Sequence, residues 1–164
     1  TQDGSRKTFD FVLSYDMTYC SLYLFYLQSP DSTPAAGKRT VGTLHLLHLE
    51  SDYPLITKES VAQYAVHPTM NYVACVLHDE KAGRESLHVI GFSPKNTGLN
   101  AKIDGERIDG LRWARDRRLL GFLDSTESTD KDGKRRVDSA LYTWQRDVDN
   151  PHWETIVTRV DTSK

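Results

Sequence analysis

Six histidines are the side chains of this sequence best suited to acid–base chemistry or metal binding. A serine nucleophile that works with a histidine base is often exposed by a G-x-S-x-G turn, and that pattern is absent. Neither H-E-x-x-H nor C-x-x-C occurs, so metal-ligand spacing is missing as well. We therefore expect no catalytic residue, no metal site and no cofactor. The histidines are His45, His48, His67, His78, His88 and His152.

The acidic segment 124–133 has some features of a calcium-binding loop. With Ser128, Asp130 and Asp132 at the first three ligand positions, Gly133 falls at the sharp turn of an EF-hand loop. The position of the bidentate glutamate is then Ser139, which cannot supply two oxygens. No flanking helix is expected either. We interpret the segment as a solvated hairpin loop.

Two basic clusters are the best candidates for contact with an acidic protein or peptide. Loops carry most of the binding function of rigid scaffolds, and both clusters are expected on loops. Several aspartates lie close by in the sequence and dilute the charge, so the alternative reading is ordinary solvated turns. The clusters are Arg112, Arg115, Arg117 and Arg118, and Lys134, Arg135 and Arg136.

The composition describes a chain of 164 residues that is 38% hydrophobic and 27% charged, with a net charge of -2. This balance argues against nonspecific binding to nucleic acid or to anionic membranes, because both need a strong basic excess. Only Cys20 and Cys75 are present, both in apolar runs, so we expect small buried thiols and no disulfide framework. No signal peptide or membrane span is evident, which favours a reducing, cytoplasmic setting, although removal of a leader before Thr1 stays open.

An internal repeat is the most informative feature of the sequence. Three apolar runs align with spacings of 53 and 47 residues, and each has a small residue in its third place. Small side chains at one level of neighbouring strands allow sheets to pack closely. The runs are 19–23, 72–76 and 119–123, and the small residues are Ser21, Ala74 and Gly121.

Each run is flanked by further strand-like segments, so that every copy contains four short strands joined by polar turns. A Leu-His, Leu-His, Leu-Tyr pair recurs in the third strand of the copies, at 44–45, 87–88 and 141–142. We therefore predict an all-β fold, a single segment over 1–164 made of three four-stranded antiparallel blades of a β-propeller. The approximate blades are 9–57, 61–103 and 108–157. The alternative is a β-sandwich or a small β-barrel.

The third copy resembles the propeller repeats of the prolyl oligopeptidase family and of TolB-like proteins. It reads Leu111-Arg112-Trp113-Ala114-Arg115-Asp116-Arg117-Arg118-Leu119-Leu120-Gly121-Phe122 and continues at Ala140-Leu141-Tyr142. The first copy has Tyr15-Asp16 without a tryptophan, and the second has His67-Pro68 with Asn71 near the place of the aspartate. The resemblance implies a propeller, which in that family accompanies a serine peptidase domain.

Three blades cannot close a propeller of four to eight, so we expect either the remainder of a larger propeller or a self-associated copy. The leading interpretation is a non-catalytic protein-interaction or scaffolding module that binds a protein or peptide partner. One alternative is part of the substrate-gating propeller of a prolyl-oligopeptidase-like serine hydrolase. Another is a carbohydrate-binding propeller formed by self-association.

Overall fold

The computed structural model describes residues 8–29, 39–50, 53–93, 96–115, 119–129, 131–146 and 155–159. Every regular element in these residues is a β-strand, and none of them forms a helix long and apolar enough to cross a membrane. The prediction of an all-β fold is confirmed. The strands are β1 (Val12–Met17), β2 (Tyr23–Gln28), β3 (Gly42–His48), β4 (Tyr53–Val66), β5 (Tyr72–Asp79), β6 (Arg84–Ser93), β7 (Asn96–Gly105), β8 (Ile108–Trp113), β9 (Leu119–Thr129), β10 (Arg135–Arg146) and β11 (Thr155–Arg159).

The strands form two antiparallel sheets, where the sequence predicts three. One sheet has seven strands in the order β1 to β7, and the other has four in the order β11-β10-β9-β8. The first two predicted blades join into one sheet through β4. This strand pairs with β3 at Tyr53–Lys58 and Val61, and with β5 at Val61–Val66. Between these halves the backbone bends at Ser60, with a positive φ of 57°, and no turn ends the strand.

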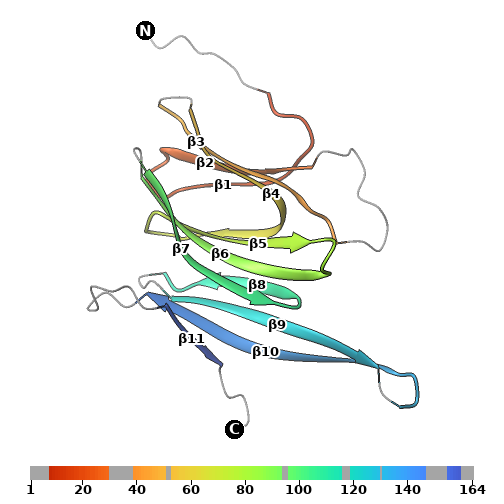
Figure 1. The fold of residues 1–164 in the computed structure, drawn as a ribbon. Helices are drawn as coiled ribbons and strands as arrows, with labels where there is room; N and C mark the ends of the chain where they lie inside the picture. The colour runs from red at the N-terminus through yellow and green to blue at the C-terminus, as the bar shows by residue number, and fades with distance from the viewer. Residues whose placement is uncertain are drawn as a thin grey trace.

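The strands stack in three layers, one above the other (Figure 1). The first layer holds β1 to β3 and the first half of β4, the second holds the other half of β4 with β5 to β7, and the third holds β8 to β11. Apolar side chains fill both gaps between layers. The first core includes Tyr23, Phe25, Leu44, Leu46, Val73, Cys75, Ile90 and Phe92. The second core includes Tyr72, Ala74, Leu87, Val89, Ile108, Leu120, Phe122 and Trp144.

The same backbone hydrogen bond closes the first turn of each layer. The amide of the residue after the first strand donates to the carbonyl that begins the second strand, at 2.8–3.1 Å. The three bonds are Thr18 to Tyr23, His67 to Tyr72 and Ala114 to Leu119, so corresponding residues lie 49 and 47 positions apart. We call the end of the layers that holds the second and third of these turns the turn side. The opposite end, with the β5–β6 hairpin, is the loop side.

This register corrects the alignment of the first copy. Ser21 was expected on a buried strand, but it lies on an exposed bend with a positive φ of 56°. Phe25 takes the position of Ala74 and Gly121, both of which lie on strands as predicted. The apolar run that begins at Tyr19 concealed the turn, because it contains none of the Pro, Asn or Asp residues that usually mark a reversal.

The alignment of the third strands is correct. His45 pairs with Tyr26 and His88 pairs with Cys75, two residues that correspond in the register above. Tyr142 pairs with Phe122 in the same way in the third layer. The two histidines therefore occupy the same place in their layers, as the sequence predicts.

The two cysteines are free thiols. Cys75 is fully buried, and burial raises the pKa of its thiol to about 12. Cys20 is partly buried, and its Sγ lies 3.3 Å from the Thr18 hydroxyl. Cys75 thus packs as a small hydrophobic residue, as expected.

Candidate functional site

The two basic clusters lie at opposite ends of β9. Arg112 and Arg115 are exposed at the turn side, next to the start of β9, whereas the cluster 134–136 follows the far tip of the β9–β10 hairpin. An 11-residue strand spans roughly 33 Å, so the clusters do not form one surface. Arg117 and Arg118 lie outside the described residues.

The cluster at the hairpin tip is partly neutralised. Arg135 forms an ion pair with Glu127, and its Nε donates to Glu127 Oε2 at 2.9 Å. Lys134 and Arg136 are exposed. Residues 124–129 of this acidic segment lie on β9 and pair with β10, so this part is strand where the sequence predicts a loop. Ser139 Oγ lies 2.7 Å from Ser125 Oγ. Among the described residues, no group of three or more His, Cys, Asp or Glu side chains is placed to hold a metal ion.

The cluster at the turn side sits on an anchored backbone. Thr69 Oγ1 donates to the carbonyl oxygen of Arg115 at 2.7 Å, and Trp113 Nε1 donates to the carbonyl oxygen of Ala65 at 2.9 Å. Both bonds join the third layer to the second. The side chains of Arg112 and Arg115 are exposed beside these anchors. The backbone of the two arginines is therefore held in place while their guanidinium groups face solvent.

Aromatic packing supports the same turn. The Trp113 ring lies 4.9 Å from the His67 ring and 6.0 Å from the Trp144 ring, between ring centroids. His67, at the end of the turn-side bond to Tyr72, is fully buried. Its Nδ1 accepts hydrogen bonds from the amides of Thr69 (3.1 Å) and Met70 (3.0 Å). The histidine thus caps the second-layer turn from inside, a role that the sequence pattern did not indicate.

A cluster of ion pairs that the sequence did not predict joins all three layers at the loop side. Arg39, which precedes β3, lies with its Nε 2.7 Å from Glu85 Oε1, and its Nη2 donates to the Ile108 carbonyl at 2.7 Å. Nη2 also pairs with Asp109 Oδ1 at 3.0 Å. Glu85 is almost fully buried, and its Oε2 accepts the amide of Ile108 at 2.7 Å.

The electrostatics of this cluster follow from its geometry. Burial alone would raise the pKa of Asp109, but hydrogen bonds and charge from Arg39, with a further contribution from Arg107, lower it. His78 Nδ1 lies 3.4 Å from Glu85 Oε1. The sequence does not predict this cluster, because Arg39 and Asp109 are 70 residues apart and neither belongs to a recognisable motif.

A cavity of about 780 Å³ opens beside the buried glutamate, on the loop side of the second layer. Ser86 Oγ lies 3.2 Å from His88 Nε2 within it, a pairing of a hydroxyl with a base. Burial lowers the pKa of His88, as do Lys58 and Lys102. However, His88 Nδ1 has no hydrogen-bond partner among the described residues, so nothing there orients the ring as a catalytic base requires. The ionisable lining residues are Glu59, His78, Asp79, Glu80, Lys81, Arg84, Glu85, His88, Lys102 and Asp104.

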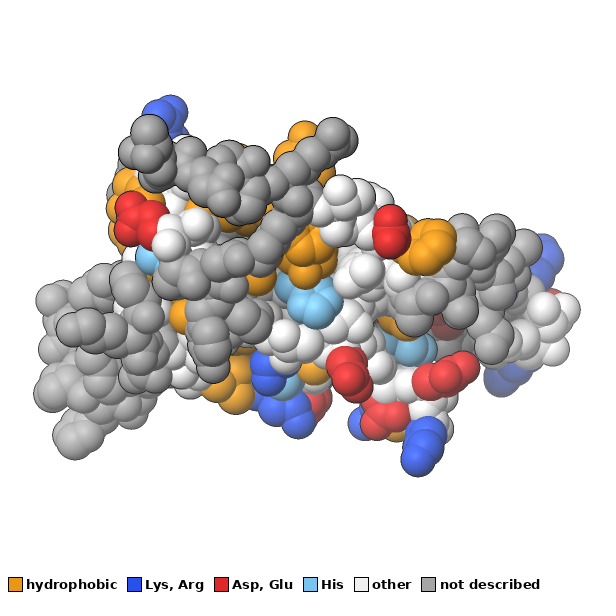
Figure 2. Space-filling view, turned by 90° about the horizontal axis from the view of Figure 1, so that it is seen from above, with side chains coloured by type: hydrophobic (Ala, Val, Ile, Leu, Met, Phe, Trp, Pro, Cys, Tyr) orange, Lys and Arg blue, Asp and Glu red, His pale blue; other side chains and the backbone are white. Residues whose placement is uncertain are grey.

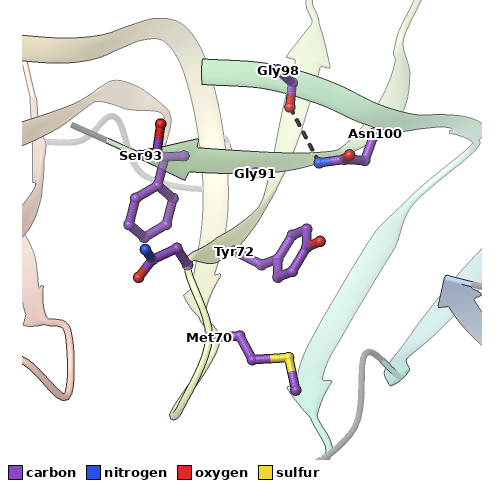
Figure 3. A pocket seen from close by; sticks show the side chains of 8 residues that line it. Met70, Tyr72, Gly91, Ser93, Gly98 and Asn100 are labelled. Carbon is purple, nitrogen blue, oxygen red and sulfur yellow. Dashed lines mark hydrogen bonds between the residues drawn. The ribbon is translucent and has the colours of Figure 1, made fainter. Parts of the chain in front are cut away.

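A smaller cavity of about 410 Å³ lies nearer the turn side (Figure 3). Tyr72 and Met70 point into the same space from β5 and the turn before it. The Asn100 side-chain amide donates to the carbonyl of Gly98 at 3.2 Å, which occupies one of its two N–H groups. Asn71 Oδ1 is buried and has no hydrogen-bond partner among the described residues. The cavity is lined by two side-chain amides, two hydroxyls, one apolar ring and the Met70 thioether, and none of these side chains is an acid or base that titrates near neutral pH.

No protein-family model matches the sequence, and no curated protein matches it. Among solved structures, the chain is similar to acylaminoacyl peptidase from Pyrococcus horikoshii, with 14% identity and a TM-score of 0.56 over 92% of this chain. It also matches the β-propeller domain of the Trilobed protease from Pyrococcus furiosus, with 11% identity and a TM-score of 0.46 over 93% of this chain. The chain spans 26% and 59% of those two chains. The first likeness is one of fold alone, and it supports a propeller-like resemblance for the stacked layers.

Proposed function

We propose that this chain is a non-catalytic interaction module of the propeller type, which binds an acidic segment of a partner protein at its turn side. In this proposal each layer is one blade, with approximate bounds 9–57, 61–103 and 108–157. The bend of β4 at Ser60 is then the passage from the outer strand of one blade to the inner strand of the next.

One observation carries the proposal: Arg112 and Arg115 are exposed on a backbone that is fixed to the neighbouring layer. An arginine on a held backbone loses less freedom on binding than one on a mobile loop. Its planar guanidinium pairs with carboxylates through two parallel hydrogen bonds and stacks on aromatic rings. Neither arginine has a partner for its side chain among the described residues, so both are available.

The tip cluster is the weaker candidate surface. Arg135 already shares its charge with Glu127, so a partner carboxylate has to compete with an existing ion pair. Arg117 and Arg118 extend the turn-side cluster in the sequence and belong to the proposed site on that basis.

The test is a titration of a fluorescein-labelled peptide rich in Glu and Asp, followed by fluorescence anisotropy. Arg112→Ala with Arg115→Ala is expected to weaken binding by about 30-fold, equivalent to ~2 kcal/mol, with an unchanged melting temperature. The matched control is Arg135→Ala with Arg136→Ala, which removes the same charge from the opposite end of β9. Equal affinities for both variants and the wild type would reject the site.

A second candidate function is that this chain forms part of the substrate-gating propeller of a serine peptidase. The fold likeness to an acylaminoacyl peptidase over 92% of this chain favours it. The natural polypeptide would then carry a G-x-S-x-G domain outside residues 1–164. In either case the chain itself is proposed to be non-catalytic, and a fluorophosphonate probe should label none of its serines.

A further inference from the structure

Two glycines line the cavity of about 410 Å³ at a point where their strands are paired (Figure 3). Gly91 of β6 pairs with Gly98 of β7 and, on its other side, with Tyr72 of β5. A Cβ added at Gly98 would meet no atom within 4 Å, and the φ of this residue is not in the left-handed region. Neither packing nor backbone conformation therefore requires a glycine at this position. A glycine within a strand weakens the strand, and it often marks a place where a ligand approaches the backbone closely.

An irregularity of the sheet holds Asn100 over the paired glycines. The register of β6 with β7 shifts between Val89 and Ile90, and Asn100 is the extra residue of this β-bulge. A Cβ added at Gly91 would lie 2.8 Å from Asn100 Nδ2, so the glycine leaves room for the amide. Nδ2 donates one of its two N–H groups to the Gly98 carbonyl, at 3.2 Å. Bulges are frequent next to functional sites, where they re-aim a side chain, and this one places a carboxamide in the lining of the cavity.

Two further side chains of the cavity favour contact with an aromatic ring. The Tyr72 ring and the Met70 thioether point into the same space (Figure 3). Both groups pack well against a second ring, the tyrosine by stacking or edge contact and the methionine through its sulfur. Tyr72 belongs to the second core and Met70 packs against that core, so both side chains are held in place. Asn71 adds a second carboxamide, whose Oδ1 is buried without a hydrogen-bond partner among the described residues.

The cavity is suited to an uncharged group. None of the eight described residues that line it carries a charge, whereas charged side chains of both signs lie along the lower edge of the molecule in the view from above (Figure 2). A matching ligand is uncharged, has a flat apolar face for the glycines and the Tyr72 ring, and has an edge that exchanges hydrogen bonds with the Asn100 carboxamide. A phenol meets these conditions, because its ring is flat and its hydroxyl both donates and accepts.

We propose that this cavity binds a tyrosine side chain of the acidic partner segment. The inference rests on the proposed function, because the cavity and the arginine site share one turn. Met70 lines the cavity and directly follows Thr69, whose hydroxyl donates to the Arg115 carbonyl at 2.7 Å. One short peptide can therefore place a carboxylate at the arginines and a tyrosine in the cavity. An aromatic anchor in a pocket beside exposed arginines is a common arrangement of interface hot spots.

The test compares two fluorescein-labelled acidic peptides that differ at one position, tyrosine or alanine, by fluorescence anisotropy. The wild type is expected to bind the tyrosine peptide about tenfold more tightly. Gly98→Val is expected to remove this difference, because the added side chain occupies the place of the ring, and to leave the affinity for the alanine peptide unchanged. Thr97→Val is the matched control, since Thr97 is exposed, precedes Gly98 on β7 and points to the opposite face of the sheet.

A third peptide, with phenylalanine at the same position, tests the hydrogen bond to Asn100. The wild type is expected to bind it roughly fivefold more weakly than the tyrosine peptide, because the hydroxyl is missing. Asn100→Leu keeps the size of the side chain and removes its polar atoms. This variant is expected to bind the tyrosine and phenylalanine peptides equally.

Equal affinities of the wild type for the tyrosine and alanine peptides would overturn the proposal. Equal effects of Gly98→Val and Thr97→Val on the tyrosine peptide would overturn it as well. Arg112→Ala with Arg115→Ala should weaken the tyrosine and alanine peptides by the same factor, so the preference for tyrosine stays unchanged. The ratio of the two affinities therefore tests the cavity, and their absolute values test the arginine site.

A neutral probe separates the cavity from the arginine site altogether. If no acidic peptide binds, the arginine site is rejected, and N-acetyl-tyrosinamide is titrated into the isotopically labelled chain. Saturable NMR shifts at the amides of Gly91, Gly98 and Asn100 would support the tyrosine cavity, and unchanged shifts would overturn it. Saturable shifts at these amides with maltose but not with the tyrosine amide would also overturn it, in favour of a carbohydrate.

Discussion

Trp113 and Ala65 are joined by a hydrogen bond of 2.9 Å from the indole nitrogen to the backbone carbonyl. The bond links the last residue of β8 to the inner half of β4, and thus the third layer to the second. The tryptophan also packs against the His67 and Trp144 rings. One side chain therefore supplies both a hydrogen bond and aromatic packing to this contact. This tie holds the backbone from which Arg112 and Arg115 project.

Trp113→Ala is expected to lower the free energy of unfolding by about 3 kcal/mol or more, because it leaves a cavity between the layers. Trp113→Phe keeps part of the ring packing and loses the bond to Ala65, so a smaller loss of about 1 kcal/mol is expected. Urea denaturation followed by circular dichroism measures both. Equal stability of the alanine variant and the wild type would show that the ring is not an interlayer anchor.

His67→Leu is expected to destabilise the chain by about 1–3 kcal/mol, because the amides of Thr69 and Met70 lose the acceptor that they share. His67→Asn is the matched variant, since its side-chain oxygen can take the place of Nδ1. Thermal melting should rank the wild type above Asn and Asn above Leu. A leucine variant as stable as the asparagine variant would contradict the capping role.

Arg39→Met is expected to cost about 3 kcal/mol or more, because it leaves the buried Glu85 carboxylate without its main counter-charge. Adding Glu85→Gln in the same chain should restore part of the loss. A double-mutant cycle by urea denaturation measures the coupling. If the two effects simply add, Arg39 and Glu85 do not act as a pair.

Stability is expected to fall between about pH 7 and pH 5. Burial lowers the pKa of His45 and, together with Lys58 and Lys102, that of His88, below the value near 6.5 of an unfolded chain. As the pH falls, the two histidines therefore take up protons in the unfolded chain before they do so in the folded chain. The stability that they contribute above pH 6.5 is lost as the pH falls through their lower pKa values in the folded chain.

The pH dependence can be tested with variants of the two histidines and of the equivalent residue in the third layer. His45→Gln with His88→Gln should flatten the curve of melting temperature against pH in this window. Tyr142 occupies the equivalent place in the third layer, so Tyr142→Phe should leave the slope unchanged. A double glutamine variant with the slope of the wild type would mean that other groups control the acid response.

The sequence predicted the strand content and the equivalence of His45 and His88, because alternating apolar residues and turn residues are local signals. It misplaced the first turn at Ser21, where an unbroken apolar run hides the reversal. It also predicted three sheets, because nothing in the sequence of β4 indicates that one strand continues through the bend at Ser60 to serve two layers.

The candidate site was predictable only in part. Arg112 and Arg115 follow from a basic turn next to a buried-type tryptophan. Their support by Thr69 does not, because a contact across 46 residues leaves no pattern in the chain. The same reason accounts for the unpredicted cluster of Arg39 with Glu85 and Asp109, which tertiary packing alone assembles.

Chemical-shift mapping by NMR tests the central claim most directly. The acidic peptide is titrated into the isotopically labelled chain, and the amide shifts are followed residue by residue. The account predicts that the largest changes fall on Arg112 to Arg115 and on the adjoining Thr69, with little change at Arg136. Changes centred on the large cavity near His88, or an absence of any saturable change, would contradict it.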